Sequence, residues 1–158
     1  MDKLILGEAT RTLDDRHRLS VPPEMVDALA PGQGRLVLAK ERPGCLSLWD
    51  PATWTARLEE GVALVEQKIL ARRLDGRLDE VQQLGRLLST RHTDIQLAGR
   101  GRLVIPDGFR EFLGVEPGGN VMVVGAAVCV ELWHPDPWCH YVGQHMPAFR
   151  ELLERLAG

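Results

Sequence analysis

The sequence of 158 residues has no apolar run long enough to cross a bilayer as a helix. Its longest nearly apolar segment, VMVVGAAVCV at residues 121–130, is too short for that. The N-terminal segment MDKLILGEATR contains an acidic residue and only a short apolar stretch, unlike a secretory signal. We therefore expect a soluble protein with no membrane partner.

Cysteine is scarce as well, with three in the chain and no Cys-x-x-Cys spacing. An odd number without short paired spacings argues against a disulfide framework and favours the reducing cytoplasm. Cys139, His140, His134 and His145 lie close together in sequence and invite a zinc interpretation. A zinc site normally needs four well-spaced ligands, often with several cysteines. We therefore expect no metal.

Catalytic motifs are absent too. The sequence contains no nucleophile elbow, no phosphate-binding loop and no paired-carboxylate motif. We expect no enzyme, no cofactor and no small-molecule substrate. A small enzyme that uses the late histidine and cysteine residues is the alternative from another functional class.

An excess of positive charge is also missing. The formal net charge is −3, and the 44% hydrophobic and 26% charged residues are ordinary for a globular protein. Nucleic-acid binding would therefore have to come from a local basic patch and not from bulk charge.

What the sequence does contain is an internal repeat. A shift of 84 residues aligns 13–54 with 97–138 without a gap and gives 13 identities in 42 positions. Tryptophan is rare, yet all four tryptophans of the chain pair in this alignment. A chance match is improbable, so we interpret the two segments as copies of one structural unit.

Each copy has the pattern of strand, turn, strand, short helix, β-hairpin and final helix. In the second copy, Phe109, Phe112 and Leu113 share one face of the short helix, and Gly114 ends it. Apolar residues at helical spacing predict a helical connector that Asp75 and Gly76 divide. The expected units are a first repeat at 1–54, a connector at 55–89, a second repeat at 90–138 and a C-terminal helix at 139–158.

One copy is too small to bury a stable core alone. Two copies can close their sheets against each other with approximate twofold symmetry, which removes exposed strand edges. The apolar strands around 121–130 permit two interpretations, a subunit contact or a better-buried strand. The sequence leaves both open.

The segments LDDRHRLSVP and GRGRLVIPDGFREFLG resemble the repeated element of the MraZ family, within the wider group of AbrB-type swapped-hairpin domains. The typical element reads Leu-Asp-x-x-Gly-Arg, then an apolar residue, any residue, Ile and Pro. CLSLWDPATW and CVELWHPDPW match the end of the element, an apolar strand ending in an aromatic residue before a tryptophan that opens a helix. The resemblance covers about 13–73 and 91–142.

The resemblance implies a mainly β fold with flanking helices (α+β), in which tandem AbrB-like swapped-hairpin repeats form a pseudo-dimeric double-split β-barrel. It further implies a ring-like homo-oligomer whose Asp-x-x-x-Arg turns contact direct repeats in promoter DNA. No cofactor follows from it. Such a regulator would be cytoplasmic and associated with the nucleoid.

The signature carries over unevenly between the copies. Asp14 and Arg18 complete it in the first copy, where His17 replaces the usual glycine. Gly101 and Arg102 match in the second copy, but Ala98 stands where the aspartate is expected. Asp14 and Gly101 are the supporting residues of the signature. The candidate DNA-binding residues are Arg11, Arg16, His17, Arg18, Arg100 and Arg102.

Arginine at a rigid turn suits this role because its planar fork can bind phosphate or guanine O6 and N7 in bidentate fashion. The competing interpretation is that these are solvated hairpin arginines, and the repetition of Arg16 and Arg18 as Arg100 and Arg102 argues against it. Ala98, His17 and the negative net charge favour a second possibility. In that case, the chain is a diverged interaction or architectural module with weakened or lost sequence-specific DNA binding.

Overall fold

A computed structural model describes residues 4–29 and 32–158 of the chain. Its strands are β1 (Glu8–Thr12), β2 (Arg18–Ser20), β3 (Arg35–Arg42), β4 (Cys45–Trp49), β5 (His92–Gln96), β6 (Arg102–Val104), β7 (Asn120–Gly125) and β8 (Val130–Trp133). The helices are α1 (Pro23–Leu29), α2 (Pro51–Leu70), α3 (Leu78–Arg91), α4 (Arg110–Leu113), α5 (Pro135–His145) and α6 (Phe149–Ala157). Short 3-10 turns cover η1 (Gly32–Gly34), η2 (Asp75–Arg77), η3 (Gly99–Gly101) and η4 (Met146–Ala148).

Six strands form one antiparallel sheet in the order β1-β7-β8-β4-β3-β5, and β2 pairs with β6 in a separate two-stranded ribbon. This is the mainly β architecture with flanking helices that the sequence indicates. The sheet does not close into a barrel, and the expectation that the two copies remove exposed strand edges is wrong for the described strands, because β1 and β5 remain edge strands that do not pair with each other. After each edge strand the chain turns away from the sheet, so the next short strand joins the ribbon and not the sheet.

The two halves of the chain exchange strands. The first strand of each half pairs with the third strand of the other, β1 with β7 and β5 with β3. Two other pairs join equivalent positions, Leu19 with Leu103 in the ribbon and Ser47 with Glu131 in the sheet. Residues 84 apart lie opposite each other at these two points, as a local twofold axis requires. Neither half therefore has a complete sheet without the other.

Strand register corrects the gapless alignment in one place. Leu13 N donates to Gly119 O (2.9 Å) and Leu97 N donates to Gly34 O (2.8 Å), so Gly34 corresponds to Gly119 and not to Gly118. The second half thus has one more residue before its hairpin. A β-bulge between Lys40 and Arg42 adds one residue to β3 in the first half, and beyond it the equivalent residues of the two halves are again 84 apart. A shift of one residue exchanges the two faces of a strand, so these compensating changes keep the apolar faces of β3 and β7 on the same side.

The main core lies between the sheet and the ribbon. Leu36, Leu38, Leu46 and Leu48 contribute from the first half, and their counterparts in β7 and β8 contribute from the second. Val121, Val123 and Val130 are fully buried in this core. The apolar segment at 121–130 is therefore mainly a well-buried strand pair, the second of the two possibilities left open by the sequence.

Each half ends in a helix that begins beside its paired tryptophans. Asp50 caps α2 by accepting a hydrogen bond from Thr53 N (3.2 Å), and His134 Nδ1 accepts from Asp136 N (3.1 Å) at the start of α5. Proline occupies the first helical position of both, where its missing N–H costs nothing. Trp49, Trp54 and Trp133 are buried, and Trp138 is half-buried in the first turn of α5.

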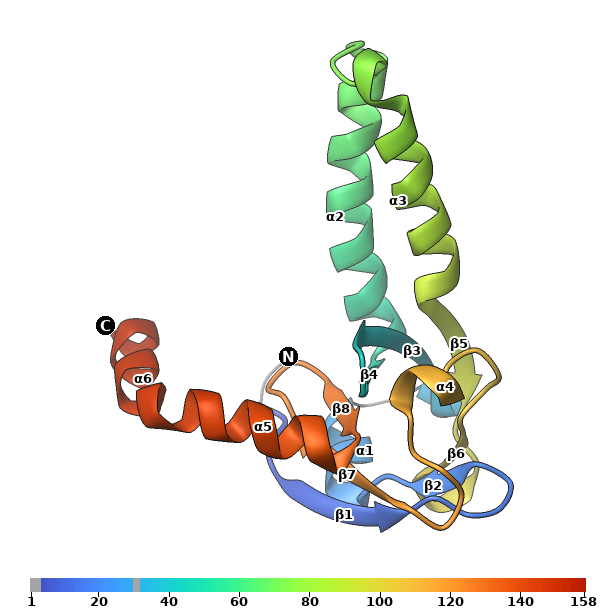
Figure 1. Cartoon of the computed structure of the whole chain (residues 1–158), viewed down its shortest axis with the longest axis vertical. Coiled ribbons are helices and arrows are strands. Elements are labelled where there is room, and N and C mark those ends of the chain that lie inside the picture. Colours follow the sequence, from blue (N-terminus) through green and yellow to red (C-terminus); the bar gives the residue numbers. More distant parts are fainter. Residues whose placement is uncertain (1–3, 30–31) are drawn as a thin grey trace.

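Two helical arms extend from the sheet in different directions (Figure 1). Helices α2 and α3 form a long hairpin, and the break between them contains the Asp75 and Gly76 pair identified in the sequence. Helices α5 and α6 form a second arm that bends at η4, which includes Pro147. Phe149, Leu152, Leu153 and Leu156 on α6 are largely exposed. Within the described residues, no helix is long and apolar enough to cross a membrane.

The buried centre of the ribbon gives a direct stability test. Leu103 is 1% exposed, whereas its neighbour Val104 is 48% exposed. Leu103→Ala should lower the free energy of unfolding by about 2–5 kcal/mol, because it removes buried methyl groups and leaves a cavity. Val104→Ala should change it by no more than about 0.5 kcal/mol. Denaturant unfolding measures both, and equal effects would contradict the burial pattern.

Candidate nucleic-acid interface

The two-stranded ribbon has one buried face and one solvent face. Leu19 and Leu103 point into the core, so the residues on either side of them point outward. The outward residues form what we call the ribbon face, which consists of Arg18, Ser20, Arg102 and Val104. Antiparallel pairing places Arg18 opposite Val104 and Arg102 opposite Ser20, so the two arginines lie near opposite ends of one face. The ribbon lies at the opposite end of the molecule from the tip of the α2–α3 hairpin (Figure 1).

The turn that leads into β2 is held by one carboxylate. Asp14 Oδ1 accepts hydrogen bonds from the backbone N–H groups of Arg16 (2.8 Å) and Arg18 (2.9 Å). Asp14 Oδ2 accepts from Arg18 Nε at 2.8 Å, which is both a hydrogen bond and an ion pair. Three donors thus converge on one side chain. This clamp fixes the turn and the rotamer of Arg18, the pairing that the signature Asp-x-x-x-Arg predicts.

The same contacts lower the pKa of Asp14 from 3.8 to about 2. The backbone N–H of Arg18 makes the largest favourable contribution, and the Arg18 side chain and the Arg16 N–H add to it. A carboxylate that accepts several hydrogen bonds is stabilised in its charged form. Asp14 is therefore ionised, and the clamp is closed, at neutral pH.

The turn that leads into β6 has no such clamp. Ala98 N still donates to Arg102 O (2.8 Å), as Asp14 N donates to Arg18 O (3.0 Å). The side chain of Ala98 offers no acceptor, however, and Arg100 adopts a positive φ of 65°. The backbone hydrogen bond that closes the first turn is kept, but the second turn differs in backbone conformation at Arg100, and the side-chain contact that orients the arginine is lost. Arg102 is accordingly free of the constraint that holds Arg18.

The two turns are tied to each other through the ribbon. Ile105 N donates to His17 O (2.8 Å), and Val21 N donates to Gly101 O (2.9 Å). Both His17 and Gly101 have positive φ, 58° and 73°. A Cβ on Gly101 would lie 2.8 Å from Val21 O, so glycine is required in the second turn. Each turn therefore depends on the strand end of the opposite half.

The remaining candidate residues lie at different distances from this face. Arg16 and Arg100 are exposed at the tips of the two turns, one beside each end of the ribbon. Arg11 is on the edge strand β1, where its guanidinium donates to Thr10 O (3.2 Å), and it is not part of the ribbon. Sequence reasoning missed Ser20 and Val104 on the ribbon face. The alternation around the buried Leu19 and Leu103 is the signal that could have identified them.

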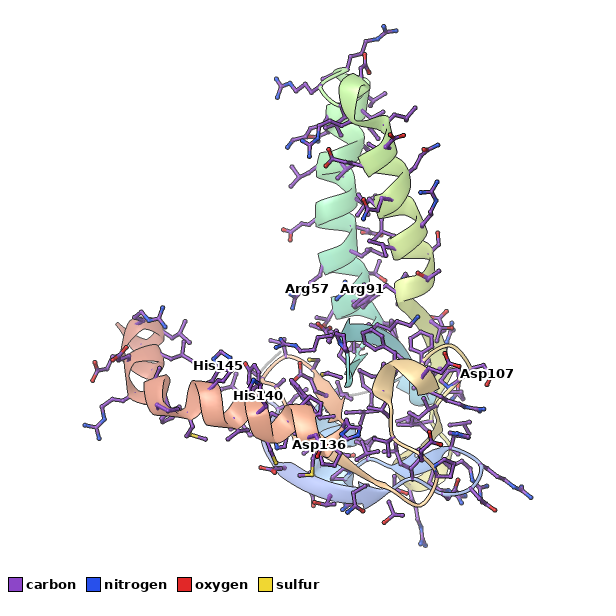
Figure 2. All side chains as sticks on the ribbon, in the orientation of Figure 1. Arg57, Arg91, Asp107, Asp136, His140 and His145 are labelled. Carbon is purple, nitrogen blue, oxygen red and sulfur yellow. The ribbon has the colours of Figure 1, made fainter. Side chains whose placement is uncertain are left out.

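The late histidine and cysteine residues have structural contacts of their own. His134 caps α5, and the ring of His145 packs against Tyr141 with a centroid distance of 4.2 Å. Figure 2 shows His140 and His145 along the second helical arm. In the described part of the chain, no three His, Cys, Asp or Glu side chains are placed to hold a metal ion. Cys45 and Cys129 are buried, and burial raises the pKa of both thiols, that of Cys129 to about 12.

Comparison with known proteins identifies the family. A family model for the MraZ protein, described as antitoxin-like, matches residues 90–158. A transcriptional regulator MraZ from Methylobacillus flagellatus is 34% identical and covers 96% of each chain. A regulator of the same name from Thioalkalivibrio sulfidiphilus is 32% identical over 84% of this chain and 81% of its own length. The chain belongs to the MraZ family.

Other matches agree with that assignment. The transcriptional regulator MraZ from Pelotomaculum thermopropionicum is 26% identical over 97% of this chain and 95% of its own length. A solution structure from Pyrococcus horikoshii, PHS018, covers 85% of the chain at 12% identity, but its TM-score of 0.33 is too low to support an argument.

MraZ proteins are transcriptional regulators and not enzymes, which removes the small-enzyme alternative. Within this MraZ chain, the complete signature is the clamped turn at Asp14 and Arg18.

Acid should open this clamp at a defined point. Because the pKa of Asp14 is lowered by folding, the contribution of the clamp to stability is fully present above the unfolded value near 3.8. That contribution is lost as the pH falls toward 2, when the carboxylate becomes protonated. NMR titration should show the amide shifts of Arg16 and Arg18 moving together with a midpoint near 2. The amides of Arg100 and Arg102 serve as the control, and a midpoint near 4 for the first pair would contradict the clamp.

Proposed function

We propose that this chain is a DNA-binding transcriptional regulator that contacts promoter direct repeats through the ribbon face and its two turns. Arg18 and Arg102 supply the contacts on the ribbon, and Arg16 and Arg100 extend them at the turn tips. The single observation that carries the proposal is the Asp14 clamp, which fixes Arg18 on an exposed two-stranded ribbon. The name that the relatives carry, transcriptional regulator, supports it.

The geometry suits a duplex. The major groove of B-DNA admits a two-stranded β-ribbon, and arginine on such a ribbon can reach guanine O6 and N7 or phosphate. Arg18 is oriented before binding, so less side-chain entropy is lost when it forms a bidentate contact. The Arg102 side chain is not oriented by a carboxylate before binding, so it would contribute mainly attraction to phosphate. The two halves would then read DNA unequally.

Useful affinity requires several copies on one DNA. One chain offers only a few arginines, and each neutralised phosphate adds about 0.9 to the salt dependence of log K. Joining chains converts later contacts into intramolecular ones and multiplies the affinity. We therefore propose a ring-like homo-oligomer that places several ribbon faces along direct repeats. This assembly would act in the cytoplasm, at the nucleoid.

A second candidate function remains because of two residues in the turns. Ala98 leaves the second signature incomplete, and His17 occupies the glycine position of the first. A chain with one clamped turn would retain phosphate attraction but discriminate less between sequences. In that case, it would act as an interaction or architectural module within the same assembly.

The proposed units remain the first repeat at 1–54, the connector at 55–89, the second repeat at 90–138 and the C-terminal helix at 139–158.

Removing both ribbon arginines tests the proposal. The double variant Arg18→Ala, Arg102→Ala should bind a duplex from the upstream region of its own gene more weakly. Each lost phosphate contact should reduce the salt slope of log K by about 0.9. Fluorescence anisotropy across a salt series measures both quantities, and sedimentation velocity checks that the assembly is intact. Arg86→Ala, on the exposed surface of α3, is the control. An unchanged affinity and slope in the double variant would refute the proposal.

Restoring the missing acceptor tests the inequality of the two turns. Ala98→Asp should create a second clamp on Arg102 and increase the ratio of specific to non-specific binding by several-fold, since one oriented bidentate contact discriminates by about 1–3 kcal/mol. Asp14→Ala should change the same ratio in the opposite direction. Competition binding against a scrambled duplex at constant salt measures this ratio. If neither substitution alters it, the clamp has no part in sequence discrimination.

A further inference from the structure

A cavity of about 410 Å³ lies at the base of the α2–α3 hairpin, where the two helices meet β3 and β4. Its volume is within the range of pockets that hold small molecules. Charged and aromatic side chains line the end near the sheet, and apolar side chains line the end along the helices. No residue of the ribbon or its two turns lines the cavity, so the proposed DNA contacts make no use of it.

The charged end contains two arginines, Arg57 from α2 and Arg91 from the last turn of α3 (Figure 2), together with Glu41 of β3. The guanidinium carbon of Arg57 lies 4.7 Å from the ring centre of Trp49, and that of Arg91 lies 5.4 Å from the ring centre of Trp54. Stacking on indole faces restrains both guanidinium groups before any ligand is present. Arg57 is exposed and Arg91 is half-buried, so the stacking orients two solvent-accessible guanidinium donors.

The charge in this end of the cavity is not balanced. Arg91 donates from Nε to Lys40 O (3.0 Å), and its terminal nitrogen lies 3.6 Å from Glu41 Oε1. The Glu41 carboxylate also accepts a hydrogen bond from Ser47 Oγ (2.6 Å). Arg57 forms no ion pair with any residue in 4–29 or 32–158. One uncompensated positive charge remains, which favours an anionic ligand.

The other half of the chain shows what this position lacks. There, Trp138 Nε1 donates to the carboxylate of Glu8 (3.2 Å), and Tyr141 packs on Trp133. Trp54 Nε1 and His92 Nδ1 are buried and have no hydrogen-bond partner among the described residues. At these positions the first half thus has the Arg57 cation and a Trp54 N–H without an acceptor among the described residues, whereas the second half has the Glu8 carboxylate. The corresponding positions, 84 residues apart, are Trp49 and Trp133, Trp54 and Trp138, Arg57 and Tyr141, and His92 and Glu8.

The other end of the cavity is apolar and open. Val62 and Val65 of α2 face Leu84 and Leu88 of α3 across it. Gly61 also lines the cavity, and a Cβ built on it would meet no atom within 4 Å. A ligand with an anionic head and an apolar body would match both ends at once.

We propose that this cavity binds a small amphipathic carboxylate, with its head group on Arg57 and Arg91 and its apolar body between α2 and α3. The two guanidinium groups supply charge-assisted hydrogen bonds to the carboxylate oxygens. The valine and leucine side chains cover the body and remove it from water. The site shares no residue with the proposed DNA contacts, so this proposal can be tested separately from DNA binding.

Octanoate is the probe for this site, with octan-1-ol and acetate as matched controls. Isothermal titration of the full-length protein should show saturable binding of octanoate, and neither control should bind comparably because each lacks one half of the recognition. Arg57→Gln should weaken octanoate by about tenfold or more, since it removes a charged partner. Equal binding of octanol and octanoate would overturn the proposal, and so would no octanoate binding at all.

A cavity-filling pair separates this site from a contact between copies. Gly61→Leu should abolish octanoate binding without loss of folding, because the new side chain enters open space and leucine favours the helix. Gly85→Leu on α3 also enters open space but lies outside the cavity lining, so it should leave binding unchanged. Circular dichroism verifies that both variants are folded. If Gly61→Leu spares octanoate binding, or alters only the mass of the assembly, the cavity is not a carboxylate site.

Discussion

The exchange of strands between the two halves is the constraint on which the rest of the molecule depends. Because β1 pairs with β7 and β5 pairs with β3, neither half can complete its hydrogen bonds alone. The ribbon centred on Leu19 and Leu103 exists only when both halves are folded together. The turns share this dependence, because a carbonyl oxygen in each turn accepts a hydrogen bond from a backbone N–H at the strand end of the opposite half. A surface that presents two arginines on one face is therefore a product of the whole fold.

Sequence periodicity and the internal repeat were sufficient to predict most of the helices and strands and the approximate equivalence of the two halves. The paired tryptophans and the glycine after α4 are local signals, and each led to the element observed. The register of β3 and β7 could not be found in this way. An extra residue before one hairpin and a bulge in the other cancel in a gapless alignment, and only hydrogen bonds such as Leu13 N to Gly119 O reveal them.

The candidate interface was only partly predictable from the sequence. Asp14 and Arg18 were identified because their spacing matches a known signature, and the structure supplies the reason, a carboxylate that collects three donors. Ser20 and Val104 belong to the same face but have no distinctive composition. Closure of the barrel was expected from symmetry and does not occur, because pairing of β2 with β6 uses the short strands without joining the two sheet edges.

The two halves share the same order and pairing of strands, and they differ at several side chains that hold their exposed parts. At the ribbon, the carboxylate of Asp14 in the first half has only Ala98 as its counterpart. At the base of the helical arms the difference is reversed, since the Glu8 carboxylate accepts from Trp138 Nε1, while Trp54 Nε1 has no acceptor among residues 4–29 and 32–158. Duplication within one chain thus allows each half to keep the contacts that hold the fold while its exposed sites take different chemical roles.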